Sequence, residues 1–260
     1  MKIKLLGTGA AWPDELRNPP GFLIENNDKK YLIECGPGIT IQILKAGYKP
    51  TEIDNVFLTH SHIDHCCDFP YFVKGSYLTS RPNDINVYGP VGTIEFIDNL
   101  MNRTFSYLKP FLLKRRNREI KIFTKEFRDG KVFEEDNLIV ECKRVIHESE
   151  LESIAYKFTA NDKSIVITGD LEPSDSIIAL AKDVDILLIN CSFPEDSGLI
   201  PGHCTPSQIG ELANKANVKT VVLAHLFPPH RGKEEQTIAE IKKHFNGEII
   251  IGTDFDTLEA

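Results

Sequence analysis

Residues 59–65, with the sequence THSHIDH, constrain this chain more than any other segment. Three imidazoles and a carboxylate follow directly after a short apolar run, a pattern typical of a buried strand that ends in a loop of metal ligands. Alternation along an extended chain places His60 and His62 on one side, whereas the adjacent Asp64 and His65 diverge. Imidazole and carboxylate are ligands that zinc prefers. We therefore interpret this histidine cluster as a metal site in which Asp64 and His65 can serve a second ion beside the first.

The composition is consistent with one globular domain. The chain has 260 residues, of which 41% are hydrophobic, and a chain of this length buries roughly 70–75% of its surface on folding. Because α/β folds of this length are commonly single, we expect one domain over residues 1–260. The formal net charge of −8 argues against broad attraction to nucleic acid, which needs a positive surface. Two divalent ions would still add positive charge where an anionic substrate binds.

Other features predict a cytoplasmic protein that does not span a membrane. No apolar run approaches the roughly 18 residues of a membrane-spanning helix, and the N-terminal residues lack the apolar core of a signal peptide. The six cysteines form no C-x-x-C pair, and their spacing is unlike that of a secreted disulfide framework. We therefore expect reduced thiols and a cytoplasmic location.

Strand and helix patterns alternate along the chain and predict an α/β fold, in which two packed mixed sheets are covered by helices. The second half restates the order of the first, since each half begins with a hairpin and continues through helices and buried strands. Gly89-Pro90 predicts a break after one strand. The predicted strands are 2–6, 22–25, 31–34, 54–58, 85–88, 119–123, 138–145, 153–158, 164–168, 185–189, 220–224 and 248–251. The predicted helices are 39–47, 69–78, 94–101, 174–182, 207–216 and 233–245.

One helix start is specified in detail. Thr205 is predicted as the N-cap, Pro206 occupies the first helical position, and Gln208 can reach back to the cap. The capping pattern therefore predicts where this helix begins.

Polar residues at strand ends complete the predicted metal site. His147, Asp170 and His225 follow predicted strands, and side chains at one edge of a sheet system can converge although they are far apart in sequence. A dinuclear site follows, in which Asp170 bridges and each ion keeps room for a shared water. Its predicted first ion is held by His60, His62 and His147, and its second by Asp64, His65 and His225.

At this point the sequence resembles the metallo-β-lactamase superfamily. The resemblance runs in order through Glu34-Cys35-Gly36, the histidine cluster, His147, Gly169-Asp170 and His225, and it covers nearly the whole chain. It implies a four-layer αββα sandwich of two mixed β-sheets flanked by helices, with metals at one sheet edge. Within the family, the motifs that are similar to the ribonuclease Z branch and its phosphodiesterase relatives are residues 6–11 (LGTGAA), Arg17-Asn18, Tyr88-Gly89-Pro90 and Gly202-His203 with Thr205.

The resemblance also implies catalytic roles for two residues. Asp64 would be both a metal ligand and a group that orients or deprotonates the bridging water. His203 would steady the charge that develops on phosphorus or protonate the leaving oxygen. The chemistry has its own physical basis, because two Lewis acids clamp a phosphodiester oxygen and a proton donor completes the site. A structural role for His203 beside a helix N-terminus is the alternative.

The chain departs from ribonuclease Z in one large feature. That family carries a long arm that grips transfer RNA between the positions of His147 and Gly169-Asp170, whereas residues 156–164 here predict a tight hairpin. Ile189-Asn190-Cys191-Ser192 also stands where ribonuclease Z has a His-Glu-Ala-Thr motif, and Asp68 stands where relatives commonly have glycine. These departures and the acidic charge favour a small anionic phosphodiester or a short nucleic acid as substrate.

Three functions follow as hypotheses. The first is a dinuclear phosphodiesterase that cleaves a small or single-stranded phosphodiester, the second is a ribonuclease Z-type RNA endonuclease, and the third is a metal-binding sensor without catalysis. Zinc is the ion we expect, although manganese or iron would fit the same ligands. Analogy with relatives favours a homodimer.

Several further residues have open or minor roles. His230 and Arg231 are expected at the surface more often than at substrate, and the basic run Lys114–Arg118 is expected to be a solvated loop rather than a phosphate site. His244 is given no role. The candidates for structural roles or for holding a ligand imidazole in place are Glu25, Glu34 and Glu195.

Overall fold

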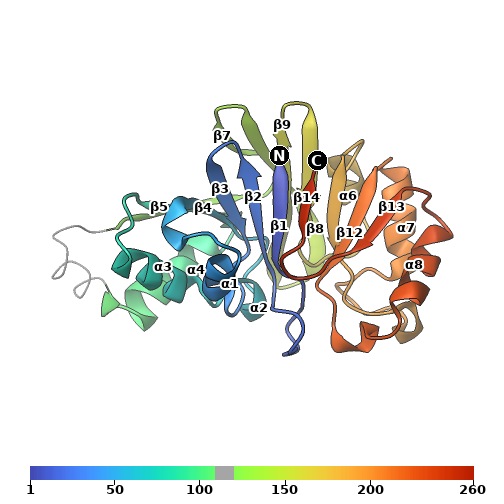
Figure 1. Cartoon of the computed structure of the whole chain (residues 1–260), viewed down its shortest axis with the longest axis horizontal. Helices are drawn as coiled ribbons and strands as arrows, with labels where there is room; N and C mark the ends of the chain where they lie inside the picture. Colours follow the sequence, from blue (N-terminus) through green and yellow to red (C-terminus); the bar gives the residue numbers. More distant parts are fainter. Residues whose placement is uncertain (109–119) are drawn as a thin grey trace.

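A computed structural model of the protein describes residues 1–108 and 120–260. Within this part of the chain, two seven-stranded sheets pack face to face, and helices cover both outer faces (Figure 1). The two chain termini lie close together, where β14 pairs with β1. The α/β class and the four-layer αββα arrangement predicted from the sequence are therefore confirmed.

The first sheet is built mainly from the N-terminal half of the chain. Its strands, in spatial order, are β14 (Thr257–Glu259), β1 (Lys2–Gly7), β2 (Gly21–Asn26), β3 (Lys29–Ile33), β4 (Ile53–Phe57), β5 (Ile85–Pro90) and β6 (Ile122–Phe127). Neighbours from β14 to β3 are antiparallel, and neighbours from β3 to β6 are parallel. The sheet is therefore mixed.

The second sheet repeats this plan with the C-terminal half. Its strands, in spatial order, are β13 (Glu248–Ile251), β12 (Thr220–Ala224), β11 (Ile186–Asn190), β10 (Lys163–Ile167), β9 (Leu151–Ala160), β8 (Leu138–Glu148) and β7 (Gly130–Glu135). Neighbours from β7 to β10 are antiparallel and those from β10 to β13 are parallel. The expected restatement of the first half by the second is confirmed.

The helices form the two outer layers. The first sheet is covered by α1 (Ile39–Lys45), α3 (Phe69–Leu78), α4 (Thr93–Asp98) and the π-helix η2 (Asn99–Thr104), and the short α2 (Ile63–Cys66) lies beside them. The second sheet is covered by α6 (Asp175–Leu180), α7 (Pro206–Lys215) and α8 (Glu234–Lys242). Single turns of 3₁₀-helix are η1 (Pro50–Glu52), η3 (Glu195–Ser197) and η4 (Pro228–His230).

Three apolar layers hold these elements together. Between the sheets, the Phe57 ring packs edge-on against Tyr156 and Phe158, at centroid distances of 5.5 and 5.4 Å. The Tyr156 hydroxyl donates to the carbonyls of Leu58 and Tyr88 at 2.9 and 3.1 Å, so this buried group is satisfied across the sheets. Two further clusters pack the helices onto the outer faces. Burial of this apolar surface is the main stabilising contribution.

Some predicted elements were wrong in detail. Gly89-Pro90 does not break the strand, because β5 continues to Pro90 and pairs with β6 there. β7 and β14 were not predicted, since both are short and polar, and each pairs at a sheet edge. His147 lies within the last residues of β8 rather than after it.

The capping and hairpin predictions are confirmed. The Thr205 side chain accepts the backbone N–H of Gln208 at 3.3 Å, and the Gln208 side chain accepts the Thr205 N–H at 3.0 Å. Asn161 and Asp162 have φ of 51° and 60° in the turn between β9 and β10, as a two-residue hairpin requires. No helix within residues 1–108 and 120–260 has the length and apolar character needed to cross a bilayer.

Strand direction explains where the polar residues gather. β10, β11 and β12 are parallel, and β8 runs in the same direction as β10 because both are antiparallel to β9. The C-terminal ends of these strands therefore share one edge. The backbone N–H of Ile154 in β9 donates to the carbonyl of Thr59 at 3.0 Å, which brings the loop after β4 to the same edge.

Candidate metal centre

The first donor set consists of His60, His62, His147 and Asp170, whose ligand atoms lie within 4.8 Å of one another. His147 Nε2 lies 3.3 Å from His62 Nδ1 and 3.7 Å from Asp170 Oδ2. His60 Nε2 lies 4.0 Å from Asp170 Oδ2. His60 and His62 face the same side as predicted, with ring centroids 4.7 Å apart. The structure thus brings the predicted ligands of the first ion together.

The second donor set consists of Asp64, His65 and His225, which meet the same 4.8 Å limit. His225 Nε2 lies 3.2 Å from Asp64 Oδ2 and 3.3 Å from His65 Nε2. His65 Nε2 lies 3.5 Å from the same Asp64 oxygen, so these neighbours converge rather than diverge. The expectation of divergence was wrong because the chain turns into α2 at Ile63, where side chains no longer alternate.

Asp170 lies between the two donor sets. Its Oδ2 is 3.7 Å from His147 Nε2 and 3.8 Å from His65 Nε2, and its Oδ1 is 3.4 Å from His225 Nε2. The Asn190 side chain donates to Oδ1, which fixes the orientation of the carboxylate. This is the place that the sequence predicted for a bridging ligand.

Each ligand imidazole is held through its second nitrogen. His60 Nδ1 lies 2.9 Å from Thr59 Oγ1, and His65 Nδ1 lies 3.3 Å from Glu34 Oε1, an ion-pair contact without hydrogen-bond geometry. The Thr59 hydroxyl in turn donates to Glu34. Such partners fix the ring orientation and the tautomer of a ligand. Of the three glutamates considered beforehand, Glu34 therefore has this role.

Two of the remaining three histidines are held by residues that follow strands of the second sheet. His147 Nδ1 lies 2.9 Å from the Gly202 carbonyl, and His225 Nδ1 lies 3.0 Å from Ser192 Oγ. His62 differs, because its Nε2 lies 3.4 Å from the exposed Glu148 carboxylate. Its Nδ1 is therefore the nitrogen available to the first donor set.

Backbone geometry at the site is unusual. His225 and Glu34 adopt left-handed φ values of 58° and 62°, which cost non-glycine residues of the order of 1 kcal/mol or more. Gly169 also has φ of 61°, and a Cβ there would lie 2.3 Å from Thr59 Oγ1. Only glycine therefore lets the end of β10 approach the histidine cluster closely enough to place Asp170 beside it.

The buried charges are strongly coupled. Burial lowers the pKa of His60 well below its usual value, and the charge on His65 lowers it further. Burial also acts to lower the pKa of His65, but Glu34 and the site aspartates raise it to about 9. Burial would raise the pKa of Asp170, but the charges on His225, His65 and His60 hold it well below its usual range. Asp170 is therefore held ionised inside the site, where its negative charge favours a bound cation.

The donors suit divalent ions of the zinc type. His60 Nε2 is buried and has no hydrogen-bond partner within the described residues, which would be costly unless another group satisfies it. The five histidines and two aspartates offer nitrogen and carboxylate oxygen, the ligands of such ions. Glu34 also lies within 4.8 Å of His60 and His65, but it faces His65 Nδ1, on the side of the ring away from the second donor set.

His203 lies next to both donor sets. Its ring centroid is 5.3 Å from that of His147 and 6.2 Å from that of His225. Its Nδ1 lies 2.9 Å from Ser192 Oγ, and burial lowers its pKa. Glu172 accepts the N–H of Gly202 at 2.7 Å, which anchors the loop that carries His203. The structure therefore brings His203 to the site that the sequence predicted.

Two hollows open beside these residues. One, of about 480 Å³, is lined by His147, Glu148 and Arg144, and the other, of about 280 Å³, is lined by His203, Leu199 and Gln208. Glu172 lines both. Of the histidines at the site, His147 lines the first hollow and His203 lines the second.

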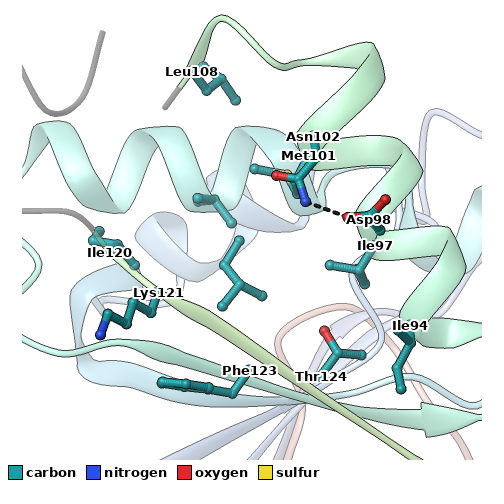
Figure 2. Close-up of a pocket in the computed structure, with 12 residues that line it drawn as sticks. Ile94, Ile97, Asp98, Met101, Asn102, Leu108, Ile120, Lys121, Phe123 and Thr124 are labelled. Carbon is teal, nitrogen blue, oxygen red and sulfur yellow. Dashed lines mark hydrogen bonds between the residues drawn. The ribbon is translucent and has the colours of Figure 1, made fainter. Parts of the chain in front are cut away.

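A third cavity, of about 420 Å³, lies elsewhere, between α3, α4, η2 and β6 (Figure 2). Apolar side chains such as Ile97, Met101 and Leu108 line it, and Asn102 donates to Asp98 at 2.5 Å. None of the predicted ligands contributes to it. It is therefore separate from the candidate metal centre.

The remaining candidates have structural positions. His230 is buried, with Nε2 3.9 Å from Cys191 Sγ, so the expectation of a surface position was wrong for this residue. Arg231 pairs with Asp14. Glu25 accepts the Tyr48 hydroxyl at 2.5 Å, and Glu195 accepts the N–H of Ser207 at 2.9 Å. The run Lys114–Arg118 lies outside the described residues.

Comparison with known proteins decides the family. A family model described as the beta-lactamase superfamily domain matches residues 29–226. The chain belongs to this superfamily. The ribonuclease Z of Mycobacterium bovis (strain BCG / Pasteur 1173P2) is 26% identical to this superfamily member over 276 aligned positions, which cover 100% of the chain and 98% of the relative. The ribonuclease Z of Archaeoglobus fulgidus is 25% identical over 314 positions, covering 100% and 97%.

Solved structures agree on the fold. The metallo-beta-lactamase fold protein YhfI from Bacillus subtilis matches with a TM-score of 0.83 at 23% sequence identity, covering 100% of this chain and 99% of that one. The predicted metallo-β-lactamase fold is therefore confirmed. As a superfamily member with ribonuclease Z homologues, the chain is a metal-dependent hydrolase, and the fold and its His/Asp donor sets imply divalent-metal binding.

Sequence reasoning missed several residues that shape the site. Ser192, Asn190, Gly202 and Glu172 each contact a ligand, or the loop that carries His203, and none was assigned a role. Asn190 gave a usable signal, because a polar residue that ends an otherwise apolar buried strand often faces a site. The others gave none, since their contacts join elements far apart in the chain.

Proposed function

We propose that this superfamily member is a dinuclear phosphodiesterase that hydrolyses a small or single-stranded phosphodiester. The observation that carries the proposal is the position of Asp170, which lies within 3.4–3.8 Å of nitrogens from both donor sets. A carboxylate whose Oδ2 faces His147 and whose Oδ1 faces His225 suits two ions rather than one. Two ions held close together are a recurrent arrangement in phosphoryl-transfer sites.

The proposed ligands are those described above. His60, His62 and His147 would hold one ion, Asp64, His65 and His225 would hold the other, and Asp170 would bridge. When bound, such ions supply Lewis acidity and lower the pKa of water. Zinc fits this imidazole-rich set best, and manganese or iron would use the same donors.

Two side chains complete the proposed chemistry. Asp64 Oδ2 lies 3.2 Å from His225 Nε2, so in this proposal the Asp64 carboxylate orients an attacking water and accepts its proton. His203 adds a hydrogen-bond donor beside the ligands, where charge builds up on the phosphate oxygens. In this proposal the proton acceptor is Asp64, which is itself a ligand, and the hydrogen-bond donor is His203, which lies beside the ligands.

The proposed substrate is small because the second sheet offers no arm. β9 and β10 are joined by the two-residue turn Asn161-Asp162. This turn lies in the interval in which the ribonuclease Z family is expected to carry its RNA-binding arm. The alignment with the Archaeoglobus relative needs 314 positions for a chain of 260 residues, so that ribonuclease Z carries additional segments. The charge of −8 also disfavours a large nucleic-acid contact.

RNA endonuclease activity is the second candidate, for a specific reason. The Mycobacterium bovis ribonuclease Z aligns over only 276 positions, so a relative of that name is nearly as short as this chain. Length alone therefore does not separate the two functions.

The test is a substrate panel. Bis(p-nitrophenyl) phosphate, a thioester and a lactone would each be assayed with zinc or manganese and again with a chelator. We expect metal-dependent turnover of the phosphodiester. Normal turnover of the thioester or lactone without phosphodiester turnover would overturn the proposal. Cleavage of a precursor transfer RNA at its 3′ trailer, at a rate above that of the small substrate, would favour the second candidate.

A further inference from the structure

The Ser192 hydroxyl joins two histidines with different proposed tasks. Its Oγ lies 3.0 Å from Nδ1 of His225, a proposed ligand, and 2.9 Å from Nδ1 of His203, the proposed donor. Ser192 is fully buried and His225 is 1% exposed, so bulk water does not compete for these bonds. We call this hydrogen-bonded chain His225–Ser192–His203 the serine bridge.

The number of protons limits how the serine bridge can be arranged. A serine hydroxyl donates once and accepts up to twice, so the two Nδ1 atoms cannot both be acceptors. If both were donors, the hydroxyl hydrogen would have no acceptor, because the structure gives this oxygen no other partner within residues 1–108 and 120–260. A buried donor without a partner costs about 1–3 kcal/mol. One ring must therefore donate and the other accept.

The proposed second ion decides which ring donates. His225 Nε2 faces Asp64 Oδ2 at 3.2 Å and Asp170 Oδ1 at 3.4 Å, so Nε2 is the nitrogen directed at the ion. A ring nitrogen that ligates a metal must be unprotonated, and the proton of a neutral imidazole then lies on the other nitrogen. His225 Nδ1–H therefore donates to Ser192, and the Ser192 hydroxyl is left to donate to His203 Nδ1.

We propose that Ser192 is a positioning residue that keeps the proton of His203 on Nε2. The inference rests on the proposed function, because the direction of the serine bridge follows from His225 being a ligand. Because His203 Nδ1 accepts a hydrogen bond, the single proton of the neutral ring lies on Nε2, and this N–H group can donate. His203 lines the hollow of about 280 Å³, so this N–H group is available to a substrate oxygen. Ser192 itself does not reach the substrate.

The place of the His203 ring does not depend on Ser192 alone. Phe193 packs edge-on against it at 5.7 Å, and His147 does so at 5.3 Å. The preceding residue, Gly202, is held by His147 and Glu172 at 2.9 and 2.7 Å. Removal of the Ser192 hydroxyl should therefore leave the His203 ring in position but allow its proton to lie on either Nδ1 or Nε2.

The test uses the full chain loaded with zinc and a direct view of the tautomers. Long-range ¹H–¹⁵N spectra of the histidine rings would be recorded for the wild type, Ser192→Ala and Ser192→Thr. We expect His203 protonated on Nε2 and His225 on Nδ1 in the wild type, a mixture of His203 tautomers in Ser192→Ala, and the wild-type pattern again in Ser192→Thr. The kcat for bis(p-nitrophenyl) phosphate should fall about 10–100-fold in Ser192→Ala and recover in Ser192→Thr.

Ser153→Ala is the matched control, because Ser153 is also buried but its hydroxyl has no hydrogen-bond partner within the described residues. It should change neither the spectra nor kcat. His203 protonated on Nδ1 in the loaded wild type would overturn the inference, as would an unchanged His203 tautomer in Ser192→Ala. If Ser192→Ala does not fold, the wild-type and Ser192→Thr spectra decide.

The outcomes separate this inference from the proposed function. If the predicted tautomers are observed but the protein does not hydrolyse the phosphodiester, the inference about Ser192 is supported and the proposed function is contradicted. If the protein hydrolyses the phosphodiester but His203 carries its proton on Nδ1, the proposed function is supported and the inference about Ser192 is contradicted. A chain that binds no metal at His225 would overturn both.

Discussion

The Nε2 atoms of His65 and His225 lie 3.3 Å apart inside the protein, although 160 positions separate the residues in the sequence. Both atoms also lie within 3.5 Å of the same Asp64 oxygen. Two ring nitrogens and a carboxylate oxygen that converge on one point present three lone pairs when the nitrogens are unprotonated, as metal ligands must be. A shared cation satisfies all three at once, and the predictions below follow from this arrangement.

Replacing Asp170 should remove one ion. Asp170→Asn keeps the size of the side chain but loses the negative charge that faces His147, His65 and His225. We expect the metal content to fall from two ions to one and phosphodiester turnover to fall at least about 100-fold. Metal analysis and steady-state kinetics would check this. Asp185→Asn is the control, because Asp185 is a mostly buried carboxylate that pairs with Lys219 away from the site; loss of metal in both variants would contradict the account.

His203 should act on the reaction without holding metal. His203→Gln should retain both ions and lose about 100- to 1,000-fold in kcat, the usual effect of removing one donor to a developing charge. The loss should be similar for a p-nitrophenyl and an alkyl leaving group if His203 donates to the other phosphate oxygens. A much larger loss with the alkyl group would instead assign protonation of the leaving oxygen. His244→Gln, at an exposed position, should behave as the wild type.

Gly202 should be needed for its lack of a side chain. An alanine Cβ at Gly202 would lie 2.8 Å from His147 Nδ1 and 3.0 Å from its carbonyl oxygen, so Gly202→Ala should displace this ligand and lower metal affinity about 10–100-fold. Gly198→Ala carries a similar backbone strain, with φ of 74° against 81°, but meets no atom within 4 Å. Titration of the metal-free variants with zinc would compare them. Equal affinities would show that strain, not contact with His147, explains any effect.

The buried His230 should make folding stability sensitive to acid. Burial lowers its pKa to about 4 in the folded chain, whereas an unfolded histidine has a pKa of about 6.5. The unfolded chain therefore takes up a proton first as the pH falls, and stability is lost between about pH 6.5 and pH 4, by about 1–2 kcal/mol at pH 5. Urea unfolding at pH 7 and pH 5 should show a smaller pH effect in His230→Gln than in the wild type. An equal pH effect in both would contradict the lowered pKa.

The parts of the fold predicted well are those with local causes. The capping box at Thr205 and the hairpin turn at Asn161-Asp162 are determined by residues within a few positions of each other. The buried parallel strands, such as β11 and β12, were predicted because burial on both faces leaves continuous apolar runs. The polar edge strands β7 and β14 lack such a run, and only their pairing with distant strands defines them.

The residues of the candidate site also fall into those that could be predicted from sequence and those that could not. The seven proposed ligands were predictable because histidine and aspartate are metal-ligand types that follow several buried strands here, and strand direction brings those strand ends together. Ser192 and Gly202 were not predictable, since a serine and a glycine carry no distinctive signal in sequence. Their roles come from distances of 2.9–3.0 Å to histidines that lie 11 to 55 positions away. The proposed ligands could thus be predicted from sequence, whereas Ser192 and Gly202, which contact His225, His203 and His147, could not.

The central claim is that two ions together support phosphodiester hydrolysis. It is tested most directly by adding zinc stepwise to the metal-free protein while bound metal and turnover of bis(p-nitrophenyl) phosphate are measured in the same samples. We expect turnover to rise until two ions are bound per chain and then to stay constant. Full turnover with one ion bound, or no turnover with two ions bound, would contradict it.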